Sequence, residues 1–405
     1  MQDNAKSTVS IASNKKIALA VNECLNKLQI PDLNGKKILL KPNVGRETTP
    51  KQGITTNPEV VSAVYYYLNE RFDASFFIGD SPIINTNTIK AFEQSGYTNL
   101  LKEKGLKFLD LDDRPPLDVK IPKGNILKKI KLTGYFYEFD YIISIPVLKF
   151  HMHCGASLSF KNMKGLIYKN TKKNLHHLQN VEILHKLQMN NKKIKELDIA
   201  IADLVHVMKP DLAIVDASIA QEGMGPSSGS PVQLNMIIGS TDFLAADIVA
   251  LALTQPKWTI DDVPHLSLIA NILKGAARSL EDITTIPSNI QPFTQELKPP
   301  PKSISINYNN VHLIDIESCS ACLSTVFNLL KNNKELIDTH YTPEKPLRLA
   351  IGKGINKSDL YDDTFLIGNC TASFKDKGHF IKGCTPVEST IIETIKEVIN
   401  LRKRK

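Results

Sequence analysis

The feature that most constrains the fold is a buried apolar run that ends in a dense polar cluster, within residues 141–177. Residues 141–147 read Tyr-Ile-Ile-Ser-Ile-Pro-Val, a run that a globular chain buries as a central strand. The polar cluster that follows includes His151, Ser157, Lys161 and Asn162. Open α/β sheets bind ligands where their strands end, so the sequence predicts a site here. The alternative is a solvated, lysine-rich loop.

The order of the expected elements indicates an α/β fold. Strands are expected at 37–40, 75–78, 106–109 and 211–215, and the first three alternate with helices at 15–28, 60–68 and 88–94. Asn57 and Pro58 fit the N-cap and first residue of the second helix. The alternation predicts a mostly parallel sheet flanked by helices on both faces.

Other strand ends also release polar residues. Pro42 cannot continue a central strand, so its neighbours are expected in a loop. Because parallel strands end at the same edge of a sheet, these residues are expected to meet the polar cluster. The side chains expected there are Lys41, Asn43, Asp80, Ser81, Asp216 and Glu222.

The residue types in the cluster suggest several kinds of chemistry. Desolvation lowers the pKa of a lysine, which would make Lys161 a nucleophile or an imine-forming group. His151 is suited to proton transfer and neutral His177 to metal ligation. Lys161 and Asn162 are equally able to bind a phosphate or carboxylate as hydrogen-bond donors, or to form structural pairs. The carboxylates of Asp216 and Glu222 are suited to hold a cation such as Mg²⁺ or to cap loops.

Four of the six cysteines lie in the C-terminal quarter of the chain and predict a metal centre. They are Cys319, Cys322, Cys370 and Cys384. All four are expected at strand ends or helix starts, where backbone N–H groups favour the thiolate. Four thiolates can hold a [4Fe–4S] cluster or a structural Zn²⁺. The second pair is too widely spaced for a usual zinc site, which favours the cluster; reduced, unliganded thiols are the third alternative.

Length and composition set the domain organisation. A chain of 405 residues is long enough for more than one core. Prolines at 292 and 299–301 predict a linker at 291–302, between an α/β domain at 1–290 and a smaller α/β iron–sulfur domain at 303–405. In the smaller domain, strands are expected at 311–316, 347–351 and 364–367, and helices at 322–330 and 386–401.

Charge and hydropathy exclude several classes of protein. The net charge of +8 is spread over 50 basic and 42 acidic residues, without a nucleic-acid-binding motif. Residues 1–16 contain no apolar signal-peptide core, and no apolar run approaches the ~18 residues of a membrane span. The sequence therefore predicts a cytoplasmic protein with a small anionic substrate, no nucleic-acid partner and no membrane span.

A set of motifs between residues 36 and 270 resembles a known family. The motifs are Lys41-Pro42-Asn43, Asn57-Pro58, Gly79-Asp80-Ser81-Pro82, Lys161-Asn162 with Gly165, Asp216 with Glu222-Gly223 and Gly225-Pro226, and Ala245-Ala246-Asp247. In this order they resemble the domain-of-unknown-function family numbered 362. That family has no assigned activity, so the resemblance implies a fold more than a function.

Two further resemblances concern cofactors. His151, Gly155, Ser157, Lys161 and His177 are similar in spacing to a pattern of nickel-dependent lactate racemases. The resemblance implies a metal or organometallic cofactor, attached at Lys161 and ligated by His177, with His151 as an acid/base. That family has an earlier acid/base histidine, whereas no histidine precedes His151 here. Racemisation with two bases is therefore not expected.

Residues 315–390 carry the other resemblance. The order Cys-x-x-Cys, Gly-x-Cys and Gly-Cys is similar to the cluster-bearing small subunits of nickel–iron hydrogenases and of complex-I-type NADH dehydrogenases, with Thr385 in place of their proline. It implies a [4Fe–4S] cluster. The leading hypothesis is an iron–sulfur oxidoreductase that exchanges electrons with its substrate or with a partner protein. The alternatives are a racemase- or isomerase-like enzyme and a non-catalytic iron–sulfur carrier or assembly factor.

Overall fold

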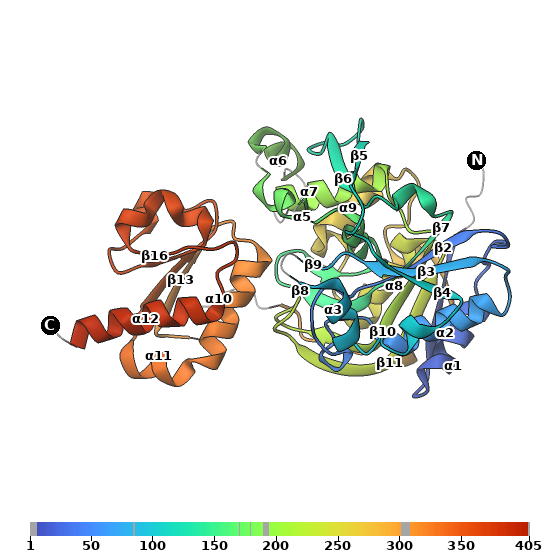
Figure 1. The fold of residues 1–405 in the computed structure, drawn as a ribbon, viewed down its shortest axis with the longest axis horizontal. Helices are drawn as coiled ribbons and strands as arrows, with labels where there is room; N and C mark the ends of the chain where they lie inside the picture. The colour runs from blue at the N-terminus through green and yellow to red at the C-terminus, as the bar shows by residue number, and fades with distance from the viewer. Residues whose placement is uncertain are drawn as a thin grey trace. The chain divides into compact units, whose positions relative to one another are not determined.

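The computed structural model describes residues 6–83, 86–169, 171–178, 180–188, 194–300 and 308–403. These form two compact units (Figure 1). The larger unit comprises the chain up to Gly223 together with Gly229–Pro299, and the smaller unit comprises Met224–Ser228 and the chain from Pro300 onward.

A ten-stranded sheet forms the centre of the larger unit. Its order is β12-β1-β11-β10-β7-β2-β3-β4, with β8 and β9 attached beside β10. The strands are β1 (Ser7–Ser13), β2 (Lys37–Pro42), β3 (Ser75–Asp80), β4 (Leu106–Asp110), β7 (Tyr141–Ile145), β8 (Val147–His151), β9 (Gly155–Ser157), β10 (Leu212–Glu222), β11 (Ser230–Ser240) and β12 (Ile283–Ile286). The run from β10 through β7, β2 and β3 to β4 is parallel, whereas β11 runs antiparallel to both of its neighbours. The predicted mostly parallel sheet is therefore confirmed.

Helices cover both faces of this sheet, each over its own apolar core. One core is closed by α1 (Ile17–Asn26), α2 (Pro58–Asn69) and α3 (Thr88–Gln94). The other is closed by α4 (Ser159–Asn162), α7 (Glu196–Asp203), α8 (Phe243–Thr254) and α9 (Pro264–Ile272). Helix α2 begins where expected, since the Asn57 side chain accepts from the backbone N–H of Glu59 and Pro58 is the first helical residue.

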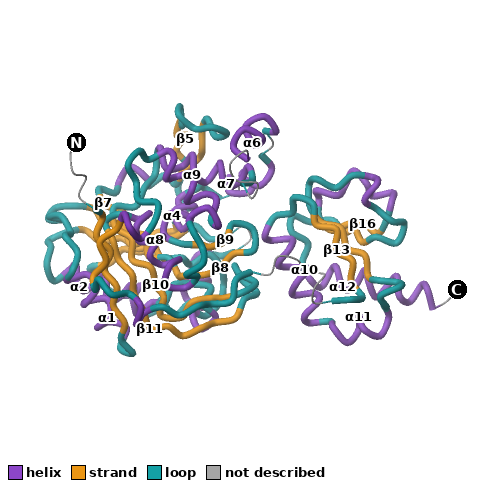
Figure 2. The backbone as a smooth tube through the Cα atoms, turned by 180° about the vertical axis from the view of Figure 1, so that it is seen from behind, coloured by secondary structure: helices purple, strands orange, loops and turns teal. Residues whose placement is uncertain are grey.

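The smaller elements lie around this framework. A separate hairpin is formed by β5 (Leu117–Lys120) and β6 (Lys129–Leu132), and short helices are α5 (Thr171–Asn174) and α6 (Val181–Gln188). Figure 2 shows the strands and helices of the chain from behind.

The apolar run at 141–147 differs from the expectation in one respect. Pro146 divides it between β7 and β8, and β8 continues through Lys149 to His151, beyond the apolar run. Lys149 can lie in a buried strand because its amine donates to Asn43 Oδ1 (2.9 Å) and to the Ile54 carbonyl (2.7 Å). Gly155, at φ +78°, then begins β9, which returns antiparallel to β8.

The predicted strand end at Asp216 is wrong. β10 continues to Glu222 as one arm of a long hairpin with β11, so Asp216 lies inside a strand. A buried carboxylate is tolerated there because it accepts from the backbone N–H of Asn57 (2.7 Å) and from the N–H and hydroxyl of Ser218 (2.9 and 2.6 Å). A sequence pattern of apolar residues cannot indicate such a strand position.

The smaller unit is a four-stranded parallel sheet with helices. Its strands, in spatial order, are β13 (Val311–Asp315), β14 (Leu347–Ile351), β15 (Phe365–Ile367) and β16 (His379–Ile381). Its helices are α10 (Ser320–Asn332), α11 (Lys334–His340) and α12 (Glu388–Lys403). Three of these strands and two of these helices lie at the positions expected from the sequence.

The segment assigned to a linker is packed in part on the larger unit. Leu297 is buried, and its backbone N–H donates to the Thr254 carbonyl. Residues 301–307, which include the last residues of the expected linker, lie outside the described residues.

Candidate functional site

Lys41 lies at the end of β2, fully buried, and is held by three oxygens. Its amine donates to Asp80 Oδ1 (2.7 Å), to the Pro42 carbonyl (3.0 Å) and to Asn162 Oδ1 (3.2 Å). Burial lowers its pKa, and the Asp80 carboxylate opposes that shift. Lys41 is therefore part of an internal ion pair with Asp80.

The carboxylate of Asp80, the partner of Lys41, accepts hydrogen bonds at both of its oxygens. Asp80 Oδ2 accepts from the backbone N–H of Val44 (2.8 Å), and Oδ1 accepts from that of Ser81 (2.9 Å). The Ser81 hydroxyl in turn contacts Asp112 and the amine of Lys172. Gly165 packs so closely over this pair that a Cβ atom there would collide with both Asp80 and Lys41. The glycine is needed for the close approach of α4 and its following turn.

Asn162 connects this ion pair to β7. Its Nδ2 donates to the Lys41 carbonyl (2.9 Å) and to Ser144 Oγ (3.1 Å), while its Oδ1 accepts from Asn43 Nδ2 (3.3 Å). Through Asn43 the network reaches Lys149, whose pKa is lowered to about 7 by burial. We call Lys41, Asn43, Asp80, Lys149 and Asn162 the strand-edge network.

Lys161 begins a second group of polar residues. It lies on α4, half-buried, and its amine donates to Ser157 Oγ (3.0 Å) on β9 and contacts the Cys154 thiol. His151 is buried at the end of β8, and its Nδ1 accepts from the backbone N–H of His153 (3.2 Å). Burial and the nearby Lys161 lower the pKa of His151 well below its usual value, so the imidazole is neutral at physiological pH.

Three lysines of these groups have no paired carboxylate among the described residues. Within the described ranges, no Asp or Glu oxygen lies within ion-pair distance of Lys149, Lys161 or Lys164. Burial, followed by repulsion from Lys161, lowers the pKa of Lys164 to about 8. Burial likewise lowers the pKa of Lys172 to about 8. The arrangement favours an anionic ligand, which would return charge balance to this region.

Two residues that the sequence did not single out lie beside Lys161 and Lys164. Asp198 on α7 and His265 on α9 are both buried, with His265 Nδ1 4.0 Å from Asp198 Oδ1. Burial raises the pKa of Asp198 to about 7 and lowers that of His265 to about 3. The sequence signal of His265 is a polar residue on the apolar stripe of a helix, three and four residues before Leu268 and Ile269. That of Asp198 is an acidic residue in the first turn of α7, where its carboxylate accepts from the backbone N–H of Lys195.

Not every expected site residue joins these groups. Glu222 lies on the same extended strand as Asp216 but six residues further on, roughly 20 Å away at the usual rise per residue. Its Oε2 accepts from the backbone N–H of Lys298 (2.8 Å). Asp216 itself holds the Asn57 loop, as described above. The side chain of His177 lies outside the described residues.

The four C-terminal cysteines gather at the carboxyl edge of the smaller sheet. Cys319 and Cys322 lie at the start of α10, after β13, while Cys370 follows β15 and Cys384 follows β16. Cys319 is half-buried, Cys322 buried, and the other two are exposed. No disulfide joins any of the chain's six cysteines.

The contacts around Cys322 bring the other cysteine-bearing loops close to it. A hydrogen bond between the Cys319 and Cys322 side chains, together with N–H groups of the α10 start, lowers the pKa of Cys319 to about 6. Thr385 contacts the Cys322 sulfur, and a Cβ atom on Gly368 would lie 3.5 Å from it. The backbones of Asn369 and Gly383 are hydrogen-bonded to each other (2.8 Å). Cys370 is two residues from Gly368, and Cys384 is next to Thr385. Both remaining cysteines are thus close in sequence to a residue that lies beside the Cys322 sulfur.

The described part of the chain contains no three His, Cys, Asp or Glu side chains already placed to hold a metal ion together. Among the same residues, no helix combines the length and apolar character needed to cross a bilayer.

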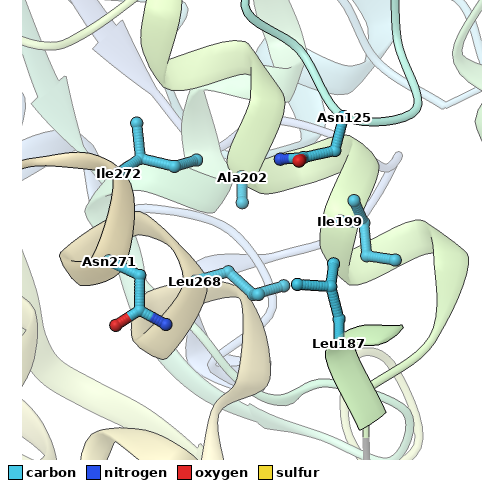
Figure 3. Close-up of a pocket in the computed structure, with 7 residues that line it drawn as sticks. All are labelled: Asn125, Leu187, Ile199, Ala202, Leu268, Asn271 and Ile272. Carbon is cyan, nitrogen blue, oxygen red and sulfur yellow. The ribbon is translucent and has the colours of Figure 1, made fainter. Parts of the chain in front are cut away.

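A cavity of about 200 Å³ lies between α6, α7 and α9 (Figure 3). The residues that line it are Asn125, Leu187, Ile199, Ala202, Leu268, Asn271 and Ile272. None of these is a residue that the sequence predicted for the site, and none carries a charge.

The family profile described as "Domain of unknown function (DUF362)" matches residues 38–252, more than half of the chain. This chain belongs to the DUF362 family. The matched region contains the strand-edge network and Lys161, and it ends before His265 and before the chain from Pro300 onward. The resemblance expected from the sequence is therefore confirmed for the larger unit.

Similar proteins were found for parts of this DUF362 chain. A thylakoid-associated protein of Synechocystis sp. is 27% identical over 222 residues, which cover 55% of this chain and 64% of that protein. The chain thus spans just under two thirds of the length of this relative. A protein from Thermotoga maritima is similar in structure at a TM-score of 0.36 and 16% identity, over 64% of this chain and 59% of the other. The lactate racemase apoprotein from Thermoanaerobacterium thermosaccharolyticum gives a TM-score of 0.38 and 11% identity, over 58% and 54%.

Proposed function

We propose that this DUF362 protein is an iron–sulfur oxidoreductase whose larger unit binds a small anionic substrate beside Lys161. The observation that supports the redox assignment is that four cysteines lie at one edge of the smaller sheet, with Thr385, next to Cys384, in contact with the Cys322 sulfur. The charge balance of the lysines supports the anionic substrate. The electron partner is proposed to be this substrate or a separate redox protein.

The donor set fits a [4Fe–4S] cluster. Its four proposed ligands are the thiolates of Cys319, Cys322, Cys370 and Cys384, and iron–sulfur clusters are commonly held by four cysteine thiolates. Such a cluster supplies one-electron transfer. The start of α10, with its free N–H groups, would stabilise the thiolate form of Cys319.

In the larger unit, the chain's own residues would bind and orient the substrate. Lys161 and Lys164 would pair with its negative charge, while the strand-edge network holds α4 in place through Asn162. His151 is buried and neutral, and its Nδ1 accepts from the His153 N–H, so its Nε2–H can donate a hydrogen bond to a bound substrate.

The decisive experiment is anaerobic purification followed by iron and sulfide analysis. We expect about four iron and four sulfide per chain, and broad absorbance near ~400 nm that bleaches with dithionite. Cys322→Ser should lose the iron and the absorbance. Cys24→Ala is the matched control, because Cys24 is a buried thiol of α1 that donates to the Ser10 carbonyl. A colourless wild-type protein that contains zinc, or no metal at all, would rule out the redox proposal.

A second candidate is an isomerase- or racemase-like enzyme without redox chemistry. It is favoured by the proximity of Lys161 to the buried His151, two groups able to exchange protons. In that case we expect nickel by elemental analysis, or an intact mass with an adduct that Lys161→Ala abolishes. An unmodified mass and no nickel would remove this candidate.

A further inference from the structure

The group formed by Cys154, Lys161, Lys164, Asp198 and His265, which we call the inner cluster, is assembled by close backbone packing. A Cβ atom on Gly155 would lie 2.5 Å from the Asp262 carbonyl oxygen and 3.0 Å from Val263. The turn after β8 therefore lies directly against the segment that leads into α9. This contact brings the loop that carries Cys154 beside the helix that carries His265.

His265 is incomplete in its hydrogen bonding. Its side chain is fully buried, and neither ring nitrogen has a hydrogen-bond partner among the residues that the structure describes. The Asp198 oxygen, at 4.0 Å, is too far away for a hydrogen bond. Buried polar atoms in proteins are almost always satisfied, so an unsatisfied imidazole indicates a missing partner.

A second imidazole has the same deficiency. His153 Nε2 is buried and lacks a hydrogen-bond partner in the described part of the chain, while its Nδ1 lies 3.4 Å from Lys195 Nζ. Its pKa is lowered to about 3 by burial, then by the charges of Lys195 and Lys161. His153 is thus a second neutral, incompletely hydrogen-bonded imidazole that is influenced by the charge of Lys161.

The charges determine what kind of partner is missing. Lys161 and Lys164 both act electrostatically on His265, and neither is paired with a carboxylate within the described ranges. A cation would be repelled by these two ammonium groups, and a neutral molecule would leave their charge uncompensated. An oxyanion can accept from both lysines and from a ring N–H at the same time.

We propose that the inner cluster binds a small oxyanion, a carboxylate or phosphate group, and that His265 donates a ring N–H to it. Lys161 and Lys164 supply the compensating charge, and the Asp198 carboxyl group lies 4.0 Å from Nδ1 of the imidazole. This inference rests on the proposed function, because it names the chemical class of the substrate group and the residue that donates a hydrogen bond to it. It adds His265, which lies beyond the region matched by the family profile.

The test is a titration of the full-length protein with two probes, orthophosphate and oxalate, at constant ionic strength. Isothermal titration calorimetry measures binding, and ¹⁵N-histidine NMR follows the ring nitrogens of His265. We expect saturable binding of at least one probe, with the His265 signals shifting in step. The probe that binds more tightly identifies the source of the oxyanion as a phosphate or a carboxylate.

Variants separate this inference from the proposed function. His265→Gln should weaken binding tenfold or more, since a hydrogen bond to a charged group is lost. His206→Gln, at a partly exposed histidine just after α7, is the matched control and should bind as the wild type does. Lys164→Met provides a second route if His265→Gln does not fold, because it should weaken binding and abolish the His265 shift.

Three results would contradict the inference. Binding with unmoved His265 signals, or undiminished binding by His265→Gln, would overturn it while the anionic substrate of the proposed function stands. No binding of either probe by the folded wild-type protein would overturn both the inner cluster and the anionic substrate. The iron and sulfide content of the same sample decides the redox proposal independently.

Discussion

The carboxyl edges of the two parallel sheets, one in each unit, carry the candidate site residues, but their side chains are in opposite situations. In the larger unit, Lys41, Asp80 and Asn162 are buried and donate to and accept from one another at 2.7–3.2 Å. In the smaller unit, Cys370 and Cys384 are exposed at the ends of loops.

This difference separates two ways of building a site. The strand-edge network is part of what stabilises the larger unit, because a buried ion pair broken on one side leaves an uncompensated charge. Side chains as exposed as those of Cys370 and Cys384 usually contribute little to the stability of a fold. Substitutions at the two edges should therefore differ greatly in their effect on stability.

The largest effect is expected for Asp80→Ala. It leaves the Lys41 ammonium buried without its carboxylate, which should lower the free energy of unfolding by about 3–5 kcal/mol. Urea unfolding followed by fluorescence of Trp258, the chain's single tryptophan, reports on the larger unit. Asp118→Ala, which removes an exposed pair with Lys131, is the control and should change little. A loss below 1 kcal/mol for Asp80→Ala would show that the network is not what stabilises this edge.

The next effect concerns pH. Burial lowers the pKa of Lys149 from 10.5 to about 7 in the folded protein, so the unfolded chain binds more protons between those values. The free energy of unfolding should therefore rise as the pH rises from about 7 to about 10. Lys149→Met should reduce this rise by about 2–4 kcal/mol in the Trp258 assay. Lys51→Met, at an exposed position, should keep the wild-type profile; a Lys149→Met profile parallel to the wild type would contradict the prediction.

A smaller effect is expected for Gly165→Ala. The added methyl group meets the buried ion pair and can be accommodated only by shifting α4 or its following turn, which should cost about 1–3 kcal/mol. Gly45→Ala is matched to it, because no heavy atom lies within 4 Å of its Cβ position. Thermal unfolding of both variants measures the difference, and equal melting temperatures would mean that the close approach is not rigid.

The smallest effect is expected at the other edge. In metal-free protein, the double variant Cys370→Ser, Cys384→Ser should change the stability of the smaller unit by less than about 0.5 kcal/mol, since both side chains are exposed. Circular dichroism during heating checks this. A loss above 2 kcal/mol would show that these side chains already stabilise the fold without a metal.

The sequence predicted the larger elements because their signals are local. The apolar run at 141–147 and the Asn57-Pro58 helix start depend on periodicity and capping alone. The extension of β10 through Asp216 was missed, since it depends on hydrogen bonds from Asn57, which is distant in sequence. Local patterns contain no information about such partners.

The candidate site was predicted in part, for the same reason. Lys41 and Asp80 do meet, as the ends of neighbouring parallel strands must, and Asn162 of α4 joins them. The sequence did not indicate that these three side chains would satisfy one another's hydrogen bonds. It also missed Asp198 and His265, whose positions depend on packing between α7, α9 and the turn after β8. Within a helix pattern a buried histidine is indistinguishable from a core residue, so only the tertiary structure singles it out.

The position of β1 has a consequence for biosynthesis. This strand pairs with β11 and β12. Ser10 can therefore pair with Gly239 and Ile286 only after those residues have left the ribosome. At about 5–20 residues per second, that interval lasts roughly 10–60 seconds. During that interval β1, whose Val9 and Ile11 are buried in the fold, has no strand partner, and unpaired strands of this kind are prone to pair with other chains.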